Sequence, residues 1–439
     1  MTAPQVFDLA VVGAGPAGLS AAVAAAQAGL SVALIDAGKQ AGGQFWRHPD
    51  ENKPSAFPAK ESTGHHHWRE FARLRAEMQA FARTGQLEFK TERQVWTIES
   101  VPDENVPDEN GSAAARLTSG TLFALRTTES YASPASSRID PARSSLVLAH
   151  RIVLVPGAAD RQLPVPGWDL PGVMAAGGVQ AMIKANQFVP GKSVLVAGTG
   201  PFLLPVAVGL AQAGARVVAI CEANSPMRWL PHIAPALRET SKGLEAIEYA
   251  SALARYRIPY RIRTVVRKIH GEDRVTAVTF ARVDAEGRII AGTDRRVAAD
   301  LVALGWGFTP SLELVIALGA ETKVNVDGSL VSVVDPWQRS SVPGVYLAGE
   351  ATGVGGSIQA LREGELAGNT VARDSAGLSE PKRIDKRLRR QIQRAGQFAQ
   401  AMHQAYPVPQ SWANWLEPET VICRCEETEF AEVARALSW

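Results

Sequence analysis

Two glycine-rich segments and a pair of cysteines carry the residue types in this 439-residue chain that could support chemistry. The first segment has the sequence Gly-Ala-Gly-Pro-Ala-Gly over residues 13–18. Its first glycine permits a tight turn, its second lets the backbone approach a pyrophosphate, and its third allows a helix to pack closely on a strand. We therefore predict that a dinucleotide is bound here, by Gly13, Gly15, Pro16, Ala17 and Gly18.

The elements around the first segment have the order that such a site requires. The predicted strand, helix and second strand cover residues 7–12, 17–28 and 31–35. The N-terminus of the helix would offer unpaired N–H groups and a partial positive charge to phosphates. Asp36 follows the second strand, 21 residues after Gly15, where a carboxylate can accept hydrogen bonds from an adenosine ribose.

The second glycine-rich segment, residues 198–203, has a similar setting. A strand, a helix and a second strand are predicted around it, over residues 193–197, 202–212 and 216–220. Gly198 and Gly200 preserve the turn and the phosphate approach. Leu203 stands in place of the third glycine, so we expect this helix to lie slightly further from its strand.

The acidic residue of the second segment is Glu222, at the end of its second strand. A carboxylate there could bind a ribose diol and would repel a 2′-phosphate, so NAD(H) is expected in preference to NADPH. A vestigial site, or one used for another adenine nucleotide, is the alternative that the sequence leaves open.

The overall composition excludes several classes of protein. The 46 basic and 44 acidic residues leave a net charge of +2, which does not favour nucleic acid or a membrane surface as the main partner. Glycines interrupt the apolar residues 9–35, so no transmembrane segment is predicted. Only three cysteines are present, which favours a reducing compartment and a cytoplasmic location.

Further motifs resemble the thioredoxin-reductase-like and glutathione-reductase-like flavoproteins of the pyridine nucleotide-disulfide oxidoreductase superfamily. Residues 42–44 (Gly-Gly-Gln) resemble their flavin-contacting turn, and residues 344–350 resemble their second FAD motif. Residues 356–364 match the helix that follows this motif, and residues 152–158 and 301–307 look like the crossings between domains. The resemblance implies FAD as cofactor, with Glu350 at the ribitol position. It adds these FAD contacts to Asp36 and the first segment: Gly43, Gln44, Gly157, Gly349, Ile358 and Gln359.

The resemblance predicts an α/β fold with two Rossmann-like dinucleotide-binding domains and a short C-terminal helical segment. The FAD domain is expected to be discontinuous, and residues 101–142 are expected to form a loop insertion on a hairpin edge. The predicted divisions are 1–172 for the first part of the FAD domain, with a flexible insertion at about 100–145, 173–298 for the NAD(P)-binding-like domain, 299–378 for the second part of the FAD domain, and 379–439 for the C-terminal segment.

The C-terminal segment contains Cys423 and Cys425, in the sequence Cys-Arg-Cys-Glu. It resembles the start of the bacterioferritin-associated-ferredoxin-like domain, which holds a [2Fe–2S] cluster with four cysteines. Two thiolates can bind one iron, but no cysteine follows Cys425, and Cys221 is expected to be a small buried residue in a strand. The cluster is therefore possible only in a longer form of the chain or with a partner chain, and it can also be absent altogether.

Disulfide reductases of this superfamily carry a cysteine pair beside the flavin, whereas residues 44–48 and 174–177 contain no cysteine. His48 is the acid–base candidate near the Gly-Gly turn.

Together the motifs resemble the group of opine oxidase A subunits, hydrogen cyanide synthase B subunits and small FAD subunits of hydroxyproline and proline dehydrogenases. This resemblance implies an electron-transfer subunit, with a second FAD-containing subunit that oxidises an amine or amino acid. The two alternatives are a free-standing NADH:acceptor reductase and a non-catalytic nucleotide-binding subunit.

Overall fold

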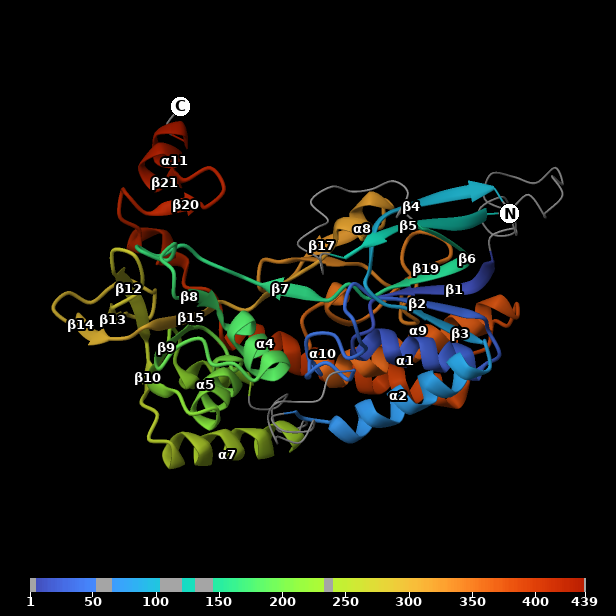
Figure 1. Cartoon of the computed structure of the whole chain (residues 1–439), viewed down its shortest axis with the longest axis horizontal. Helices are drawn as coiled ribbons and strands as arrows, with labels where there is room; N and C mark the ends of the chain where they lie inside the picture. Colours follow the sequence, from blue (N-terminus) through green and yellow to red (C-terminus); the bar gives the residue numbers. More distant parts are fainter. Residues whose placement is uncertain (1–4, 53–64, 103–120, 131–144, 233–239, 438–439) are drawn as a thin grey trace. The chain divides into compact units, whose positions relative to one another are not determined.

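The computed structural model describes residues 5–52, 65–102, 121–130, 145–232 and 240–437 (Figure 1). The chain divides into two compact units. Unit 1 comprises residues 1–159 and 309–396, and unit 2 comprises residues 160–308 and 397–439. The chain passes between the units through β7 (Ala158–Asp160) and β16 (Phe308–Pro310), which pair with each other as a two-stranded ribbon.

Unit 1 is built on a seven-stranded mixed sheet of order β3-β2-β1-β6-β5-β4, with β19 pairing β6. The neighbours of β1 are parallel to it, as is β19 to β6, whereas β5 runs antiparallel to both β4 and β6. The strands are β1 (Val6–Val12), β2 (Val32–Ile35), β3 (Leu87–Lys90), β4 (Arg93–Pro102), β5 (Thr121–Glu129), β6 (Ser145–Leu154) and β19 (Val345–Leu347).

Helices and a small ribbon cover the two faces of this sheet (Figure 1). Leu9 and Val11 of β1 face a core formed with α1, α2 and α9, while Ala10 and Val12 face a second core that includes residues of α8. This alternation follows from the two-residue period of a strand. The remaining elements are α1 (Pro16–Gln27), α2 (Trp68–Arg83), α8 (Glu313–Ala317), β17 (Thr322–Val324), β18 (Leu330–Ser332), η3 (Gly349–Thr352), α9 (Ser357–Ser375) and the first part of α10 (Arg383–Ala405).

Glycines let α9 lie against α1 at very short range. A Cβ atom on Gly364 would stand 2.0 Å from the Ala17 carbonyl oxygen, and one on Gly368 would stand 2.4 Å from that of Ala21. No side chain fits at these two positions, so the two helices pack backbone to backbone. This packing brings the start of α9 close to the first glycine segment, although the two are far apart in the sequence.

One prediction about unit 1 is wrong. The loop expected over residues 101–142 contains β5, which pairs with both β4 and β6. Leu122 to Leu125 are buried there, because pairing within the main sheet gives this short apolar run a core to face. Residues 103–120 and 131–144, which include most of the tandem duplication, lie outside the described residues.

Unit 2 is built on a five-stranded parallel sheet of order β11-β10-β9-β15-β8. One face of this sheet packs on α4 and α5, and the other packs on a three-stranded antiparallel sheet of order β12-β13-β14. The elements are β8 (Val173–Ala175), α4 (Ala176–Asn186), β9 (Ser193–Gly198), α5 (Leu203–Gln212), β10 (Arg216–Glu222), η2 (Pro226–His232), α7 (Thr240–Arg255), β11 (Tyr260–Ile262), β12 (Thr264–His270), β13 (Ala277–Arg282), β14 (Arg295–Ala298) and β15 (Leu301–Gly305).

The C-terminal part of the chain belongs to unit 2. Trp415 is buried in a small core with Trp306 of the segment after β15 and Val283 of the segment after β13. The elements here are the end of α10, η4 (Gln410–Trp415), β20 (Val421–Cys423), β21 (Thr428–Glu429) and α11 (Phe430–Leu437).

The divisions between the units differ from those predicted. Unit 2 begins at residue 160 rather than 173, because Val165 is buried in the core between its two sheets. Its first part ends at residue 308 rather than 298, because β15 is a central strand of its parallel sheet. Among the helices of the described residues, none has the length and apolar character needed to cross a membrane.

Candidate functional site

The first glycine segment forms a turn that only glycine can make at two of its positions. Gly13 has a φ of +109°, and a Cβ atom there would stand 2.4 Å from the Val155 carbonyl oxygen. A Cβ atom on Gly18 would stand 1.7 Å from the Gly13 carbonyl oxygen. The helix α1 begins directly after Gly15, so the N–H groups of its first turn have no partner within the helix.

Asp36 holds this turn from the end of β2. Its carboxylate accepts hydrogen bonds from the backbone N–H of Ala14 at 2.5 Å and from that of Gly38 at 2.6 Å. The residue is partly exposed, so its carboxylate can also accept a bond from a bound molecule. The predicted spacing of Asp36 from the glycines thus has a direct counterpart in the geometry.

The Gly-Gly turn is joined to the same loop. The Gly42 N–H donates to the Ala14 carbonyl oxygen at 2.9 Å, and a Cβ atom on Gly43 would stand 2.8 Å from the Gly15 Cα. A Cβ atom on Gly15 would meet nothing nearer than the Gly43 Cα at 4.0 Å. Gly15 and Gly43 are both partly exposed, and the Gln44 side chain is exposed.

The predicted second FAD motif (residues 344–350) and the helix after it surround a buried carboxylate that was not predicted, Glu363 of α9. It accepts hydrogen bonds from the Gly349 N–H at 2.8 Å, the Thr352 hydroxyl at 2.9 Å and the Gln359 side-chain amide at 2.8 Å. Burial raises the pKa of Glu363 to about 7. Only its helical spacing of four residues from Gln359 indicates such a contact in the sequence.

Glu350 lies beside this network. Enclosure by the surrounding protein raises its pKa to about 7, and the nearby Glu363 charge adds to the shift, while a hydrogen bond from the Gly356 backbone opposes it. Ile358 is partly buried at the start of α9, and the side-chain oxygen of Gln359 is buried without a hydrogen-bond partner. Gly157, with a φ of +79°, forms the turn after β6.

The second glycine segment resembles the first in its turn and differs in its helix. A Cβ atom on Gly198 would stand 1.7 Å from the Gly305 carbonyl oxygen. The helix α5 begins at Leu203, three residues after Gly200, and the Leu203 and Leu204 N–H groups donate within the turn, to Gly200 and Pro201. The Leu203 side chain is buried and reaches Gly305, whose missing Cβ atom leaves room for it.

Glu222 is fully buried, in contrast to Asp36. Its carboxylate accepts hydrogen bonds from the Thr199 hydroxyl at 3.0 Å, the Gly200 N–H at 2.9 Å and the Asn224 N–H at 2.8 Å. Burial raises the pKa of Glu222 to about 7, although these hydrogen bonds oppose the shift. The structure therefore brings Glu222 to Gly200, as the motif predicts, but turns its oxygens toward the protein.

The ring of His48 is held by two polar contacts. Its Nδ1 lies 2.7 Å from the Trp46 carbonyl oxygen and its Nε2 lies 2.8 Å from Glu51, which also pairs with Arg75 at 2.7 Å. Trp68 and Phe71 pack around the ring. The acid–base hypothesis for His48 stays a prediction, and these contacts indicate a structural role.

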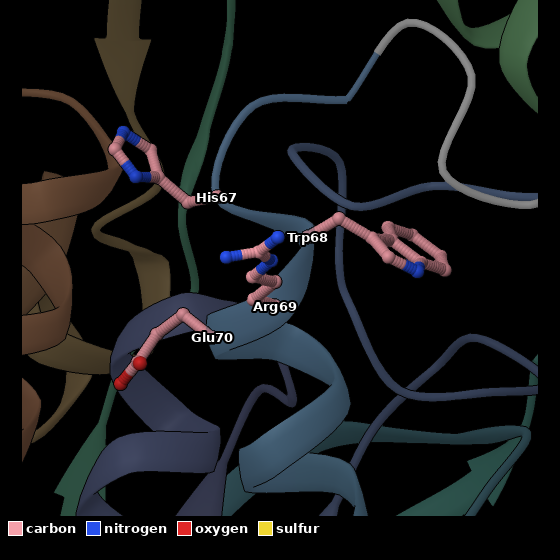
Figure 2. A pocket seen from close by; sticks show the side chains of 4 residues that line it. All are labelled: His67, Trp68, Arg69 and Glu70. Carbon is pink, nitrogen blue, oxygen red and sulfur yellow. The ribbon is translucent and has the colours of Figure 1, made fainter.

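A pocket of about 680 Å³ lies at the start of α2. Its lining includes His67, Trp68, Arg69 and Glu70, and Figure 2 shows His67 and Glu70 on one side of the chain and Trp68 on the other. These side chains belong to unit 1.

The two C-terminal cysteines lie at the end of β20 and in the turn after it. Cys423 is partly exposed and Cys425 is exposed. Arg424, between them, donates to the Trp168 carbonyl oxygen and stacks over the Trp168 ring at 4.5 Å. Cys221 is buried in the core between the sheets, where burial raises its pKa to about 12. Within the part of the chain that the structure describes, no group of three or more His, Cys, Asp and Glu side chains could hold a metal ion.

Two Rossmann-like units, each with a glycine turn and an acidic residue, define a dinucleotide-dependent oxidoreductase. Residues 7–373 match the pyridine nucleotide-disulphide oxidoreductase family, and the chain belongs to this family. It is 27% identical over 430 residues to hydrogen cyanide synthase subunit HcnB of Pseudomonas protegens, covering 98% of this chain and 84% of that protein. It is 30% identical over 443 residues to the A subunit of opine oxidase from Rhizobium meliloti, covering 99% and 76%.

Two solved structures share the fold. L-proline dehydrogenase from P. horikoshii has a TM-score of 0.62 at 18% identity, over 99% of this chain and 67% of that chain. The T. acidophilum thioredoxin reductase has a TM-score of 0.56 at 22% identity, over 85% and 99%. The predicted fold class is thus confirmed.

The chain is an FAD-dependent oxidoreductase, and its family implies binding of FAD and NAD(P). The residues of unit 1 fit FAD, because Gly15 has no side chain and is partly exposed, and the buried Gln359 oxygen has no hydrogen-bond partner. These features leave room for a pyrophosphate at one end of the site and a polar atom for a ligand at the other.

Proposed function

We propose that this chain is the FAD-binding electron-transfer subunit of a complex that oxidises an amine or amino acid. A second, FAD-containing subunit would hold the substrate, and this chain would relay the electrons to an acceptor without disulfide reductase activity. The observation that carries the proposal is the preorganised, partly exposed first loop, in which Asp36, the glycine turn and the Gly-Gly turn are already joined by hydrogen bonds.

The names of the relatives support a role in a complex. HcnB and the opine oxidase relative are both named as subunits, and the alpha subunit of sarcosine oxidase from Corynebacterium is a further relative, 26% identical over 365 residues. The sequence supports the lack of disulfide chemistry, since the stretches where the superfamily places its cysteine pair contain none. Thiol–disulfide exchange requires a thiolate nucleophile.

Each residue of the site has a defined task in this proposal. Gly13, Gly15 and the first turn of α1 would receive the pyrophosphate, and Asp36 would bind the adenosine ribose. Glu350 would bind the ribitol, while Glu363 holds Gly349 and Thr352 in place beneath it. The FAD, when bound, would supply the redox chemistry, and these residues would orient it and exclude water.

The test is to purify the native complex and measure its oxidation of amines and amino acids with an artificial acceptor. The same complex is then assembled with Gly15→Val in place of the parent chain. We expect Gly15→Val to retain the partner subunit but to lose FAD from this chain, together with electron transfer to the acceptor. The matched control is Gly396→Ala, since a Cβ atom on Gly396 would meet nothing within 4 Å.

Two results would contradict the proposal. A chain that purifies alone and fully active with NADH would favour the free-standing reductase. A Gly15→Val complex that transfers electrons at the parent rate would favour a non-catalytic nucleotide-binding subunit.

A further inference from the structure

We infer that residues 397–416, named here the closing segment, cover the second glycine loop and exclude dinucleotides from it. This inference rests on the proposed function and specifies the source of the electrons: they reach the flavin from the partner subunit rather than from NADH. The contacts that carry it all lie within unit 2.

The acidic residue of the loop cannot receive a ribose in this arrangement. Glu222 has no accessible surface, and both of its oxygens accept hydrogen bonds from the loop itself or from Asn224. The Gly200 N–H, which would face a pyrophosphate, already donates to this carboxylate at 2.9 Å. The Glu222 carboxyl group therefore already uses the N–H that a pyrophosphate oxygen would need.

The backbone of the closing segment lies directly on the loop. The Pro407 carbonyl oxygen accepts a hydrogen bond from the Asn224 side-chain amide at 2.8 Å, and the Tyr406 carbonyl oxygen lies 3.5 Å from the Thr199 hydroxyl. A Cβ atom on Gly200 would meet the Tyr406 Cβ at 4.0 Å. This is ordinary van der Waals contact. Gly200 is buried beneath the closing segment, so a phosphate could reach its N–H only if the segment moved away.

Aromatic contacts anchor the first half of the closing segment. The Trp229 ring packs against Phe398, at a centroid distance of 5.6 Å, and against Tyr406, at 6.2 Å. Trp229 belongs to η2, which follows Glu222 by only a few residues, so the anchor stands beside the loop that it helps to cover.

The second half of the segment is anchored on the turn after β13. The Trp415 indole N–H donates to the Gly287 carbonyl oxygen at 2.9 Å, and the Ser411 hydroxyl donates to that of Glu286 at 2.9 Å. Trp415 is also buried against Trp306, with a centroid distance of 5.9 Å. The segment is thus packed into unit 2 at both ends, with Tyr406 and Pro407 held over the loop between them.

The experiment uses the full chain loaded with FAD, in three forms. The opened variant carries Asn224→Ala, Trp229→Ala and Tyr406→Ala, which remove the side chains that fasten the segment over the loop. The control is Glu417→Gln, which removes an ion pair with Lys268 (2.6 Å) just beyond the segment and leaves the loop contacts intact. Binding of NADH is measured by equilibrium dialysis, flavin reduction by anaerobic bleaching, and release of residues 397–416 by hydrogen exchange.

We expect the opened variant to bind NADH at least tenfold more tightly than the parent and the control, with faster exchange in the closing segment. If the triple substitution unfolds unit 2, Tyr406→Ala alone should give a smaller gain in the same direction. The inference is overturned if the parent binds NADH as tightly as the opened variant, or if a released segment brings no gain in affinity. The FAD content and reduction by the partner subunit, measured on the same samples, show separately whether the proposed function fails.

Discussion

The two glycine loops of this chain share a motif and differ in what surrounds it. In unit 1, Asp36 and Gly15 remain partly exposed. In unit 2, Glu222 and Gly200 are buried, and the carbonyl oxygens of Tyr406 and Pro407 contact Thr199 and Asn224. The glycines and the acid position a loop, but segments distant in the sequence decide whether a nucleotide can reach it.

The amides of the two loops differ as well. The helix α1 begins directly after Gly15, so its first-turn N–H groups have no partner within the helix, and such groups favour an anion. In the second loop, the N–H groups of Leu203 and Leu204 donate within the turn and that of Gly200 donates to Glu222. We conclude that the first loop is arranged for an anion and the second is largely satisfied by the protein itself.

The largest expected effect is that of Gly15→Val, which would fill the space bordered by Gly43. A branched side chain there takes the position of the pyrophosphate, so we expect FAD retention to be abolished. The flavin absorbance of the purified protein measures this directly. Gly396→Ala serves as the control and should retain FAD, and equal FAD contents in the two variants would show that the first loop is misassigned.

A smaller effect is expected from Asp36→Ala. It removes the acceptor for Ala14 and Gly38 together with a charge-assisted ribose contact, worth about 1.5–3 kcal/mol, or roughly a ten- to hundredfold loss of FAD affinity. Glu222→Gln should leave FAD affinity unchanged and instead destabilise unit 2. Titration of the FAD-free variants Asp36→Ala and Glu222→Gln with FAD compares their affinities. Similar losses of FAD affinity in both variants would contradict the proposed difference between the two loops.

The buried carboxyl groups predict a pH dependence of stability. The pKa values of Glu222 and Glu363 rise from 4.5 to about 7 in the folded chain. Their contribution to the free energy of unfolding is complete below pH 4.5 and is lost as the pH rises through 7. Urea unfolding should therefore show lower stability at pH 7 than at pH 5.5, by on the order of 1–2 kcal/mol per group.

Glu363→Gln isolates one of these groups. The variant can keep its contacts, because the unpartnered oxygen of Gln359 can rotate to accept a hydrogen bond from the new amide. It should reduce the pH dependence, whereas Glu380→Gln, at an exposed position, should not. An unchanged pH profile in Glu363→Gln would contradict the assigned cause.

The smallest effect is expected for His48→Gln. The His48 ring bridges the Trp46 carbonyl oxygen and Glu51, and a glutamine preserves only part of this, so a loss of about 1 kcal/mol in stability is expected. The pH–rate profile of the complex should keep its shape. If the pH–rate profile of the His48→Gln complex lacked a titration step near neutral pH that the parent shows, this would indicate that His48 is the acid–base residue.

The sequence predicts the parts of this molecule that depend on local geometry. Strand–glycine–helix order and the spacing of Asp36 and Glu222 follow from the chain itself, because each loop is closed by neighbours within about 25 residues. The strand β5 was missed because its pairing is non-local and its surroundings in the sequence resemble a loop. The covering of the second loop was missed for a related reason, since Pro407 lies 183 residues from Asn224.

The most direct test of the account is the number of adenine nucleotides that one chain binds. FAD-free protein is dialysed to equilibrium against FAD and, separately, the FAD-loaded protein is dialysed against ADP. We predict one FAD per chain, bound noncovalently, and no significant binding of ADP by the loaded protein. Binding of a second nucleotide per chain, with an affinity comparable to that of the first, would contradict the claim that only the first loop is open.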